Sequence, residues 1–170
     1  DFPFDHLTAL PLLVDHIRRE LGTDLVIVSP DAGRVGVADR YVRRLGAADL
    51  AILHKRRDTE RHNVAAVPGV GEVRGRRCVL VDDMIDTAGT VVQAAEALVE
   101  HGACEVYAVA THPILSGNAV ERLRASPIRQ VVVTNSLPIP PEKAFEKLVV
   151  LSVGRIIADA IRAIFEEGSV

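Results

Sequence analysis

The residues with the clearest chemical character form one short stretch, in which an acidic pair is followed by small and hydroxyl-bearing residues. The pair is Asp82 and Asp83, and the run that begins three residues later contains Asp86, Thr87, Ala88, Gly89 and Thr90. Small residues let the backbone curl so that successive N–H groups point inward, and the start of a following helix adds a positive dipole. The threonine hydroxyls supply further donors, so the run is typical of a phosphate-binding loop.

The acidic pair offers a second kind of contact. Carboxylates repel phosphate, but they accept hydrogen bonds from the 2- and 3-hydroxyls of a sugar, or they hold a metal ion. A phosphate at one end and a diol at the other describe a ribose 5-phosphate group. On these residues alone a plainer interpretation stays open, in which Asp82 and Asp83 only end a strand and Thr90 only caps a helix.

A second candidate loop follows the first apolar run of the chain and contains Asp31, Ala32, Gly33 and Arg34. Its glycine-backed turn suits N–H donation to a pyrophosphate, and Arg34 adds positive charge. Asp31 could reach Mg²⁺ through water, because Mg²⁺ sites often have few protein ligands. The alternative is a purely structural turn.

Three adjacent cations, Lys55, Arg56 and Arg57, open a long charged segment. Such a run is usually a solvated surface. Beside two phosphate loops, however, cations that close over a transferring phosphoryl group stabilise its charge and exclude water, so Lys55 and Arg57 are candidate catalytic residues. The histidines form no zinc pattern, although His54 and His112 flank expected strand ends.

These candidate residues need elements that bring them to one edge of a sheet. Apolar runs recur along the chain and precede stretches with helical periodicity, which is typical of repeated strand–helix units. The runs are near-continuous Val, Ile and Leu segments, so the strands should be central and parallel. Strands are expected at about 24–29, 50–54, 77–81, 105–111, 130–134 and 147–151. The predicted class is an α/β fold with a mostly parallel sheet flanked by helices.

Helices are expected between these strands, with glycine at several of their ends. The expected helices span about 7–21, 35–45, 90–101, 118–125 and 153–165, and Gly22, Gly46 and Gly102 are expected to stop three of them. Residues 55–76 contain no clear helix or strong strand, which predicts a long functional loop. Three prolines within 137–141 indicate a connector.

Composition narrows the class of protein. The chain has 170 residues, 48% of them hydrophobic, and a formal net charge of -3, which fits one soluble globular domain and argues against general nucleic-acid binding. Its two cysteines have neither metal-site spacing nor the density of a disulfide scaffold, which favours a reduced, cytoplasmic setting. No apolar stretch is long enough for a membrane span. The chain opens on Asp1 without an initiator Met, so this is not expected to be a natural start.

The segment 79–90 closely resembles the phosphoribosyl-diphosphate binding motif of the type I phosphoribosyltransferase fold. Within that superfamily, the rest of the chain resembles ribose-phosphate pyrophosphokinases, also called phosphoribosyl-diphosphate synthetases. The stretches that carry this resemblance are Asp5-His6-Leu7-Thr8-Ala9, Val28-Ser29-Pro30-Asp31-Ala32-Gly33, His54-Lys55-Arg56-Arg57, Thr111-His112, Leu115-Ser116-Gly117 and Thr134-Asn135-Ser136-Leu137-Pro138. They extend over essentially the whole chain.

The resemblance implies a reaction and a division of labour. Members transfer the diphosphoryl group of ATP to the anomeric hydroxyl of ribose 5-phosphate, with Mg²⁺, and produce phosphoribosyl diphosphate and AMP. Residues 1–170 would then be a single phosphoribosyltransferase-like domain, the C-terminal half of the enzyme, without the N-terminal ATP-binding half. The family also implies hexamers, with phosphate or ADP as regulators at interfaces.

The resemblance also assigns roles to residues. Asp31–Arg34 correspond to the pyrophosphate loop with Asp31 toward the metal, Lys55 and Arg57 belong to a flexible catalytic loop, and Asp82–Thr90 bind ribose 5-phosphate. Arg34 departs from the family, because many relatives have a second glycine there. The isolated chain is expected to bind ribose phosphate weakly and not to turn over efficiently.

Two other functions compete with this one. A phosphoribosyltransferase would share the motif at 82–90, but neither the N-terminal segment nor residues 137–145 offer an obvious pocket for a base. A non-catalytic regulatory subunit would keep the fold and bind phosphorylated ligands. A subunit with a purely architectural role would need none of the polar residues at the two loops, so their presence argues against the non-catalytic subunit.

Overall fold

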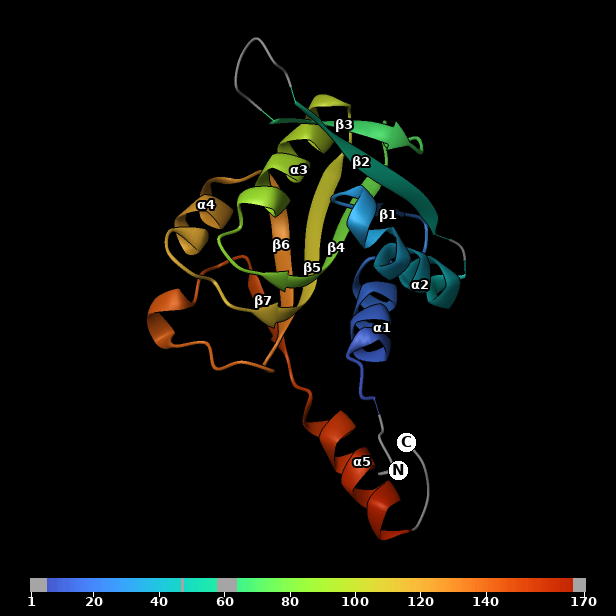
Figure 1. Ribbon diagram of the computed structural model, residues 1–170, viewed down its shortest axis with the longest axis vertical. Helices are drawn as coiled ribbons and strands as arrows, with labels where there is room; N and C mark the ends of the chain where they lie inside the picture. The colour runs from blue at the N-terminus through green and yellow to red at the C-terminus, as the bar shows by residue number, and fades with distance from the viewer. Residues whose placement is uncertain (1–5, 47, 58–63, 167–170) are drawn as a thin grey trace.

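The computed structural model describes residues 6–46, 48–57 and 64–166, without the side chains of 54–57 and 64–70. Its centre is a seven-stranded sheet in the order β3-β2-β1-β4-β5-β6-β7 (Figure 1). The strands are β1 (Val26–Ser29), β2 (Asp49–Arg57), β3 (Val64–Val70), β4 (Arg77–Ile85), β5 (Glu105–Pro113), β6 (Ile128–Thr134) and β7 (Leu148–Leu151).

Six of these strands run parallel, from β2 through β1, β4, β5 and β6 to β7. All four residues of β1 are buried, as expected for a strand that is covered on both faces. The prediction of a mostly parallel sheet built from continuous apolar runs is therefore confirmed.

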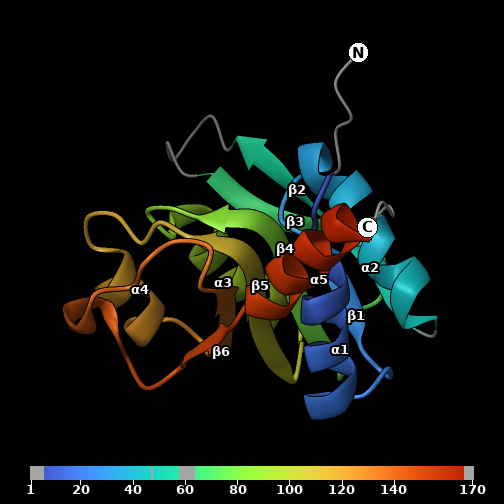
Figure 2. The same cartoon turned by 90° about the horizontal axis from the view of Figure 1, so that it is seen from below.

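Helices cover both faces of the sheet (Figure 2). The pair α1 (Leu10–Glu20) and α2 (Val35–Leu45) packs on one face, and α3 (Gly89–Glu100) with α4 (Ala119–Ala125) packs on the other. Neighbouring strand residues enter opposite cores because strand side chains alternate: Ile27 packs with α1 and α2, and Val28 packs with α3 and α4. The predicted helix stops are confirmed, since Gly22, Gly46 and Gly102 all have positive φ just beyond helix ends.

The prediction of a long loop at residues 55–76 was wrong. The strand β2 continues to Arg57, and β3 returns antiparallel to it, with Lys55 opposite Ala66 and Arg57 opposite Val64. Valines at every third position of β3 favour an extended chain, and an edge strand tolerates the adjacent charges because one side meets solvent. At Gly71, just after β3, φ is +99° and an added Cβ would lie 2.5 Å from the carbonyl oxygen of Leu50, so only glycine fits.

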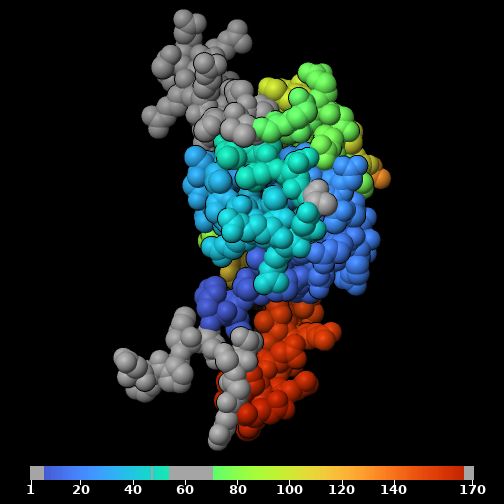
Figure 3. Space-filling view, turned by 90° about the vertical axis from the view of Figure 1, so that its right-hand side faces the viewer, coloured from blue at the N-terminus to red at the C-terminus, as the bar shows by residue number. Residues whose placement is uncertain are grey.

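The helix α5 (Gly154–Phe165) extends away from the sheet (Figures 1 and 3). None of its residues is buried, and Ile164 and Phe165 near its end are 70% and 84% exposed. Among the helices that the structure describes, none is both long and apolar enough to cross a membrane.

Candidate functional site

The order in which the chain adds strands to the sheet reverses between β1 and β4. The chain proceeds from β1 to its neighbour β2 on one side, and from β4 to its neighbour β5 on the other. The loops that leave the carboxyl ends of β1 and β4 therefore face one another, and this is where open α/β sheets bind ligands. Both predicted phosphate loops leave from this point: residues 30–34 form the β1–α2 loop, and residues 86–88 form the β4–α3 loop, which continues into the start of α3.

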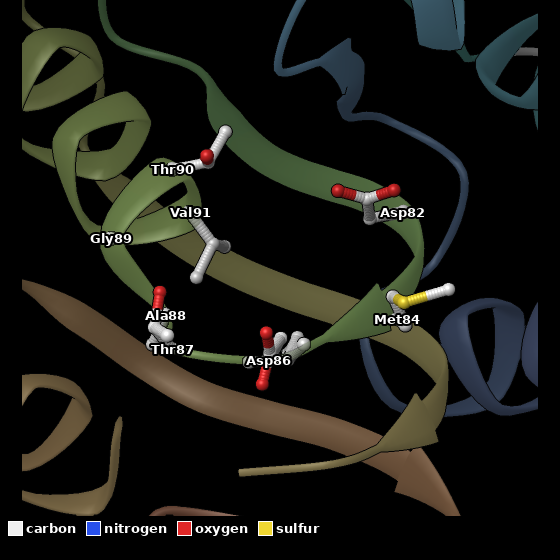
Figure 4. Close-up of a pocket in the computed structure, with 9 residues that line it drawn as sticks. Asp82, Met84, Asp86, Thr87, Ala88, Gly89, Thr90 and Val91 are labelled. Carbon is white, nitrogen blue, oxygen red and sulfur yellow. The ribbon is translucent and has the colours of Figure 1, made fainter. Parts of the chain in front are cut away.

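A hollow of about 250 Å³ lies at the β4–α3 loop (Figure 4). Asp82 and Met84 border it on one side and Thr90 on the other, with an open centre between them. The hollow is smaller than the roughly 300–1,000 Å³ typical of drug-sized ligands, which suits a sugar phosphate. Its lining consists of Asp82, Met84, Ile85, Asp86, Thr87, Ala88, Gly89, Thr90 and Val91.

Six of the seven residues predicted to bind ribose 5-phosphate line this hollow, and Asp83 does not. Asp83 lies with Asp82 at a neighbouring hollow of about 130 Å³, between the carboxyl end of β4 and helices α1 and α2. Both aspartates lie inside β4 rather than after it, because β4 continues to Ile85. The interpretation that they only end the strand does not hold.

Ala88 turns the chain into α3. Its φ of 61° is in the left-handed region, and the residue is only 5% exposed. The helix then begins at Gly89, so the first N–H groups of α3 have no partner within the helix at the border of the hollow. Thr90 lies in the first turn with an exposed side chain, and no side chain caps this helix. The interpretation of Thr90 as a cap is therefore also wrong.

Residues from β5 to α4 brace the β4–α3 loop. The Ser116 hydroxyl donates to the Asp86 carboxylate, and its backbone N–H donates to the Asp86 carbonyl at 3.1 Å. Arg122 Nη1 donates to the Thr87 carbonyl at 3.0 Å. Leu115, fully buried with φ of 50°, donates its N–H to the Ile85 carbonyl at 3.0 Å. Arg122 was not identified from the sequence, because nothing local links residues that are 35 positions apart.

Arg34 crosses from the β1–α2 loop to the acidic pair. Its Nε lies 3.2 Å from Asp82 Oδ1 and its Nη1 lies 2.8 Å from Asp83 Oδ2. Burial raises the pKa of Asp82 to about 6, and the neighbouring Asp83 carboxylate adds to this shift. Burial acts in the same direction on Asp83, but its contact with Asp82 and the charge of Arg34 outweigh it and leave the pKa of Asp83 lowered. The pKa of Asp82 is thus raised and that of Asp83 lowered, so Asp82 is the member of the pair that takes up a proton first as pH falls.

We expect this proton to make the stability of the chain depend on Asp82 between about pH 4 and pH 6. Folded Asp82 binds a proton more tightly than unfolded Asp82, so its contribution to the free energy of unfolding falls as pH rises through this window. Asp82→Asn should therefore exceed the native chain in unfolding free energy by about 1–2 kcal/mol at pH 7.5, with the difference shrinking toward pH 4.

Urea unfolding of the native chain and of Asp82→Asn across this pH range measures the difference in unfolding free energy directly. It also separates the contribution of Asp82 from that of Asp83, whose lowered pKa changes stability with pH in the opposite direction. The control is Asp39→Asn, which removes a carboxylate that pairs with Arg43 on the surface of α2. That variant should gain no stability at pH 7.5. A native chain more stable than Asp82→Asn at pH 7.5 would contradict the expectation.

The β1–α2 loop is a short 3₁₀ turn at Ala32–Arg34. Asp31 Oδ1 accepts a hydrogen bond from the Gly33 N–H at 2.8 Å, and the Ser29 hydroxyl donates to the Asp31 carbonyl at 2.7 Å. The turn interpretation therefore accounts for one oxygen of Asp31, while Oδ2 has no hydrogen-bond partner within the described residues. Those residues contain no cluster of three metal-ligating side chains. A single carboxylate such as that of Asp31 fits Mg²⁺, which keeps most of its water ligands, better than a metal ion that is coordinated entirely by protein side chains.

Lys55 and Arg57 lie on β2, but their side chains and that of His54 are outside the described part of the structure. In the parallel pairing Ser29 at the end of β1 lies opposite Ile52, and β2 continues from there to Arg57. The backbone of Lys55 and Arg57 thus extends past the same edge of the sheet from which the two loops leave. His112 is exposed and hydrogen-bonds Ser136 Oγ through Nδ1 at 2.9 Å, and it does not line the β4–α3 hollow.

The sequence matches known proteins over its whole length. A family model described as the phosphoribosyl synthetase-associated domain matches residues 58–170. The ribose-phosphate pyrophosphokinase of Streptomyces coelicolor is 54% identical over 172 residues, which cover 100% of this chain and 53% of that protein. The chain spans about half the length of the curated relatives it matches.

Solved structures agree with the sequence matches. The phosphoribosylpyrophosphate synthetase from Mycobacterium smegmatis superposes with a TM-score of 0.89 at 44% identity, over 99% of this chain and 54% of that chain. The adenine phosphoribosyltransferase from Thermoanaerobacter pseudethanolicus superposes with a TM-score of 0.55 at 18% identity, over 74% of this chain and 77% of the other. The second likeness concerns the fold alone, and it confirms the predicted type I phosphoribosyltransferase-like fold.

Proposed function

This chain belongs to the ribose-phosphate pyrophosphokinase family, and we propose that it is the half of such an enzyme that binds ribose 5-phosphate. The complete enzyme transfers the diphosphoryl group of ATP to the anomeric hydroxyl of ribose 5-phosphate and releases phosphoribosyl diphosphate and AMP. One observation carries the proposal. Two loops suited to phosphate face each other where the strand order reverses, between β1 and β4, and a carboxylate pair lies between them.

The β4–α3 loop holds the ribose 5-phosphate. Its phosphate accepts hydrogen bonds from the first N–H groups of α3 and from the hydroxyls of Thr87 and Thr90, which are both exposed at the hollow. The carboxylates of Asp82 and Asp83 accept the ribose hydroxyls. The exposed pocket is polar and small, as recognition of a sugar phosphate requires.

The β1–α2 loop holds the diphosphoryl group, and Asp31 is the residue that would hold Mg²⁺. When bound, Mg²⁺ neutralises charge on the transferring group. The one-sided hydrogen bonding of Asp31, which leaves Oδ2 available, supports this role. Lys55 and Arg57 act as the catalytic cations, because transfer of a phosphoryl group depends mainly on positioning and on stabilising charge.

Binding of ATP would require the other half of the enzyme, which the relatives contain in addition to the part that matches this chain. The hexamer, regulation by phosphate or ADP, and a cytoplasmic location stay predictions that rest on the family resemblance. Relatives near 50% identity are named pyrophosphokinases, whereas the likeness to phosphoribosyltransferases is one of fold, so a phosphoribosyltransferase is the weaker candidate. The polar residues kept at both loops disfavour a non-catalytic regulatory subunit.

The activity is tested by AMP formation from ATP and ribose 5-phosphate. We expect the 170-residue chain alone to form AMP at less than about 1% of the rate of the same chain fused to the complementary half of the Streptomyces coelicolor relative. Ribose in place of ribose 5-phosphate is the control, and it should give no AMP. Robust AMP formation by the isolated chain would contradict the division of labour, and an inactive but folded fusion would contradict the activity.

A further inference from the structure

Arg34 is the only described residue of the β1–α2 loop that forms ion pairs with the β4 strand. It is the last residue of the 3₁₀ turn and immediately precedes α2, so its backbone belongs to the β1–α2 loop while its guanidinium reaches the β4 strand. The guanidinium has five N–H donors, and the two ion pairs use two of its nitrogen atoms. Its side chain is 39% exposed, so it is not locked in place by burial.

The ion pairs limit which carboxylate oxygens can receive a ligand. Asp82 Oδ1 is shared between Arg34 Nε and the Asp83 N–H, which donates at 2.8 Å. Asp83 Oδ2 is paired with Arg34 Nη1, and Asp83 Oδ1 is buried without a hydrogen-bond partner within the described residues. Among the described residues, Asp82 Oδ2 is the one oxygen of the pair that neither contacts Arg34 nor is buried without a partner. Arg34 thus contacts one oxygen of each carboxylate, and the hydroxyls of a ribose that approach this pair compete with its guanidinium.

The position of Arg34 offers a way to release the pair. An anion in the β1–α2 loop competes with the carboxylates for the same guanidinium, and a pyrophosphate presents more charge and more acceptor oxygens than one carboxylate does. Because Arg34 adjoins this loop, a change of partner needs a side-chain rotation and no movement of the strand. Rotations of this kind are fast in exposed side chains.

We propose that Arg34 is a positioning residue that couples the two loops. It holds Asp82 and Asp83 while the β1–α2 loop is empty, and it turns to the diphosphoryl group when that loop fills, which frees the carboxylates for ribose. The inference rests on the proposed function of both loops. Because coupling between two sites is reciprocal, pyrophosphate and ribose 5-phosphate should each raise the affinity for the other, even though two anions would otherwise repel.

The test measures ribose 5-phosphate binding to the 170-residue chain by calorimetry, with and without saturating inorganic pyrophosphate at a fixed Mg²⁺ concentration. We expect pyrophosphate to tighten ribose 5-phosphate binding by roughly 5- to 20-fold in the native chain. In Arg34→Gln the factor should fall to about 1 or below, while ribose 5-phosphate alone binds at least as tightly as in the native chain. Arg34→Lys should recover part of the factor, because lysine keeps the charge but not the two-pronged geometry.

The matched control is Arg43→Gln, which removes another arginine–aspartate ion pair on α2, away from the site. This variant should keep the native coupling, and equal urea unfolding midpoints would exclude a folding defect in either variant. Coupling that persists in Arg34→Gln, or that is lost equally in Arg43→Gln, overturns the inference. If the native chain does not bind ribose 5-phosphate at all, the proposed function fails instead, so the two failures are distinguishable.

Discussion

Ala88→Val is expected to bind ribose 5-phosphate at least about 100-fold more weakly than the native chain, a loss of about 2.8 kcal/mol. Ala88 has φ of 61° and is 5% exposed, so the loop depends on a left-handed residue that has no room to relax. A β-branched side chain is strongly disfavoured at such φ, so valine should push the turn into another conformation. The first N–H groups of α3 would then no longer converge on one phosphate.

Ala88→Gly is the matched control, because glycine adopts positive φ without strain. It should bind ribose 5-phosphate within about threefold of the native chain and unfold at a similar urea concentration. Calorimetric titration measures the affinities, and circular dichroism checks that Ala88→Val keeps its helices. If a folded Ala88→Val chain bound as tightly as Ala88→Gly, the phosphate would not be held by this loop.

The second large effect concerns turnover. In the fusion with the complementary half, we expect Arg57→Ala to lower kcat by about 10²- to 10³-fold, the usual range when one group that stabilises transition-state charge is removed. Affinity for ribose 5-phosphate should change little, because the loop proposed to bind its phosphate is the β4–α3 loop. Lys55→Ala should behave in the same way.

Steady-state kinetics of AMP formation measure the effect, with binding determined separately on the chain alone. Arg43→Ala, which removes a surface cation of α2, should leave kcat within about twofold. A loss of ribose 5-phosphate affinity in Arg57→Ala with unchanged kcat would assign this residue to substrate binding. That outcome would contradict a catalytic role.

Much of the fold could be predicted because its signals are local. Continuous apolar runs such as residues 25–28 and 78–81 mark strands that are buried on both faces, and glycines with positive φ such as Gly46 mark helix ends. The two candidate phosphate loops could also be located from the sequence, since each is a contiguous string of small and polar residues. These two loops lie side by side because they leave the carboxyl ends of β1 and β4, the neighbouring parallel strands between which the strand order reverses.

The features that were missed depend on contacts between distant segments. The strand β3 forms because it pairs with β2, and the sequence of this segment alone shows no strong strand pattern. The strands β4 and β5 run past their predicted ends because they pair with each other as far as Ile85 and Pro113. Likewise, no local pattern indicates that Arg34 reaches two aspartates nearly fifty residues away.

The partner of Arg34 changes how the acidic pair is understood. From sequence, Asp82 and Asp83 were candidate acceptors for sugar hydroxyls, and Arg34 was a candidate phosphate ligand. The structure brings all three into one cluster, in which the arginine offsets the repulsion between adjacent carboxylates. The candidate ribose and pyrophosphate loops are therefore electrostatically linked before any ligand binds.

The central claim is that the β4–α3 hollow recognises a phosphate and a ribose together. Calorimetric titration of the 170-residue chain with ribose 5-phosphate, ribose and inorganic phosphate, each under the same ionic strength, tests it directly. We expect ribose 5-phosphate to bind at least about tenfold more tightly than either ribose or phosphate, and Ala88→Val to abolish this preference. Equal binding of ribose 5-phosphate and inorganic phosphate, or no binding of either, would contradict the account.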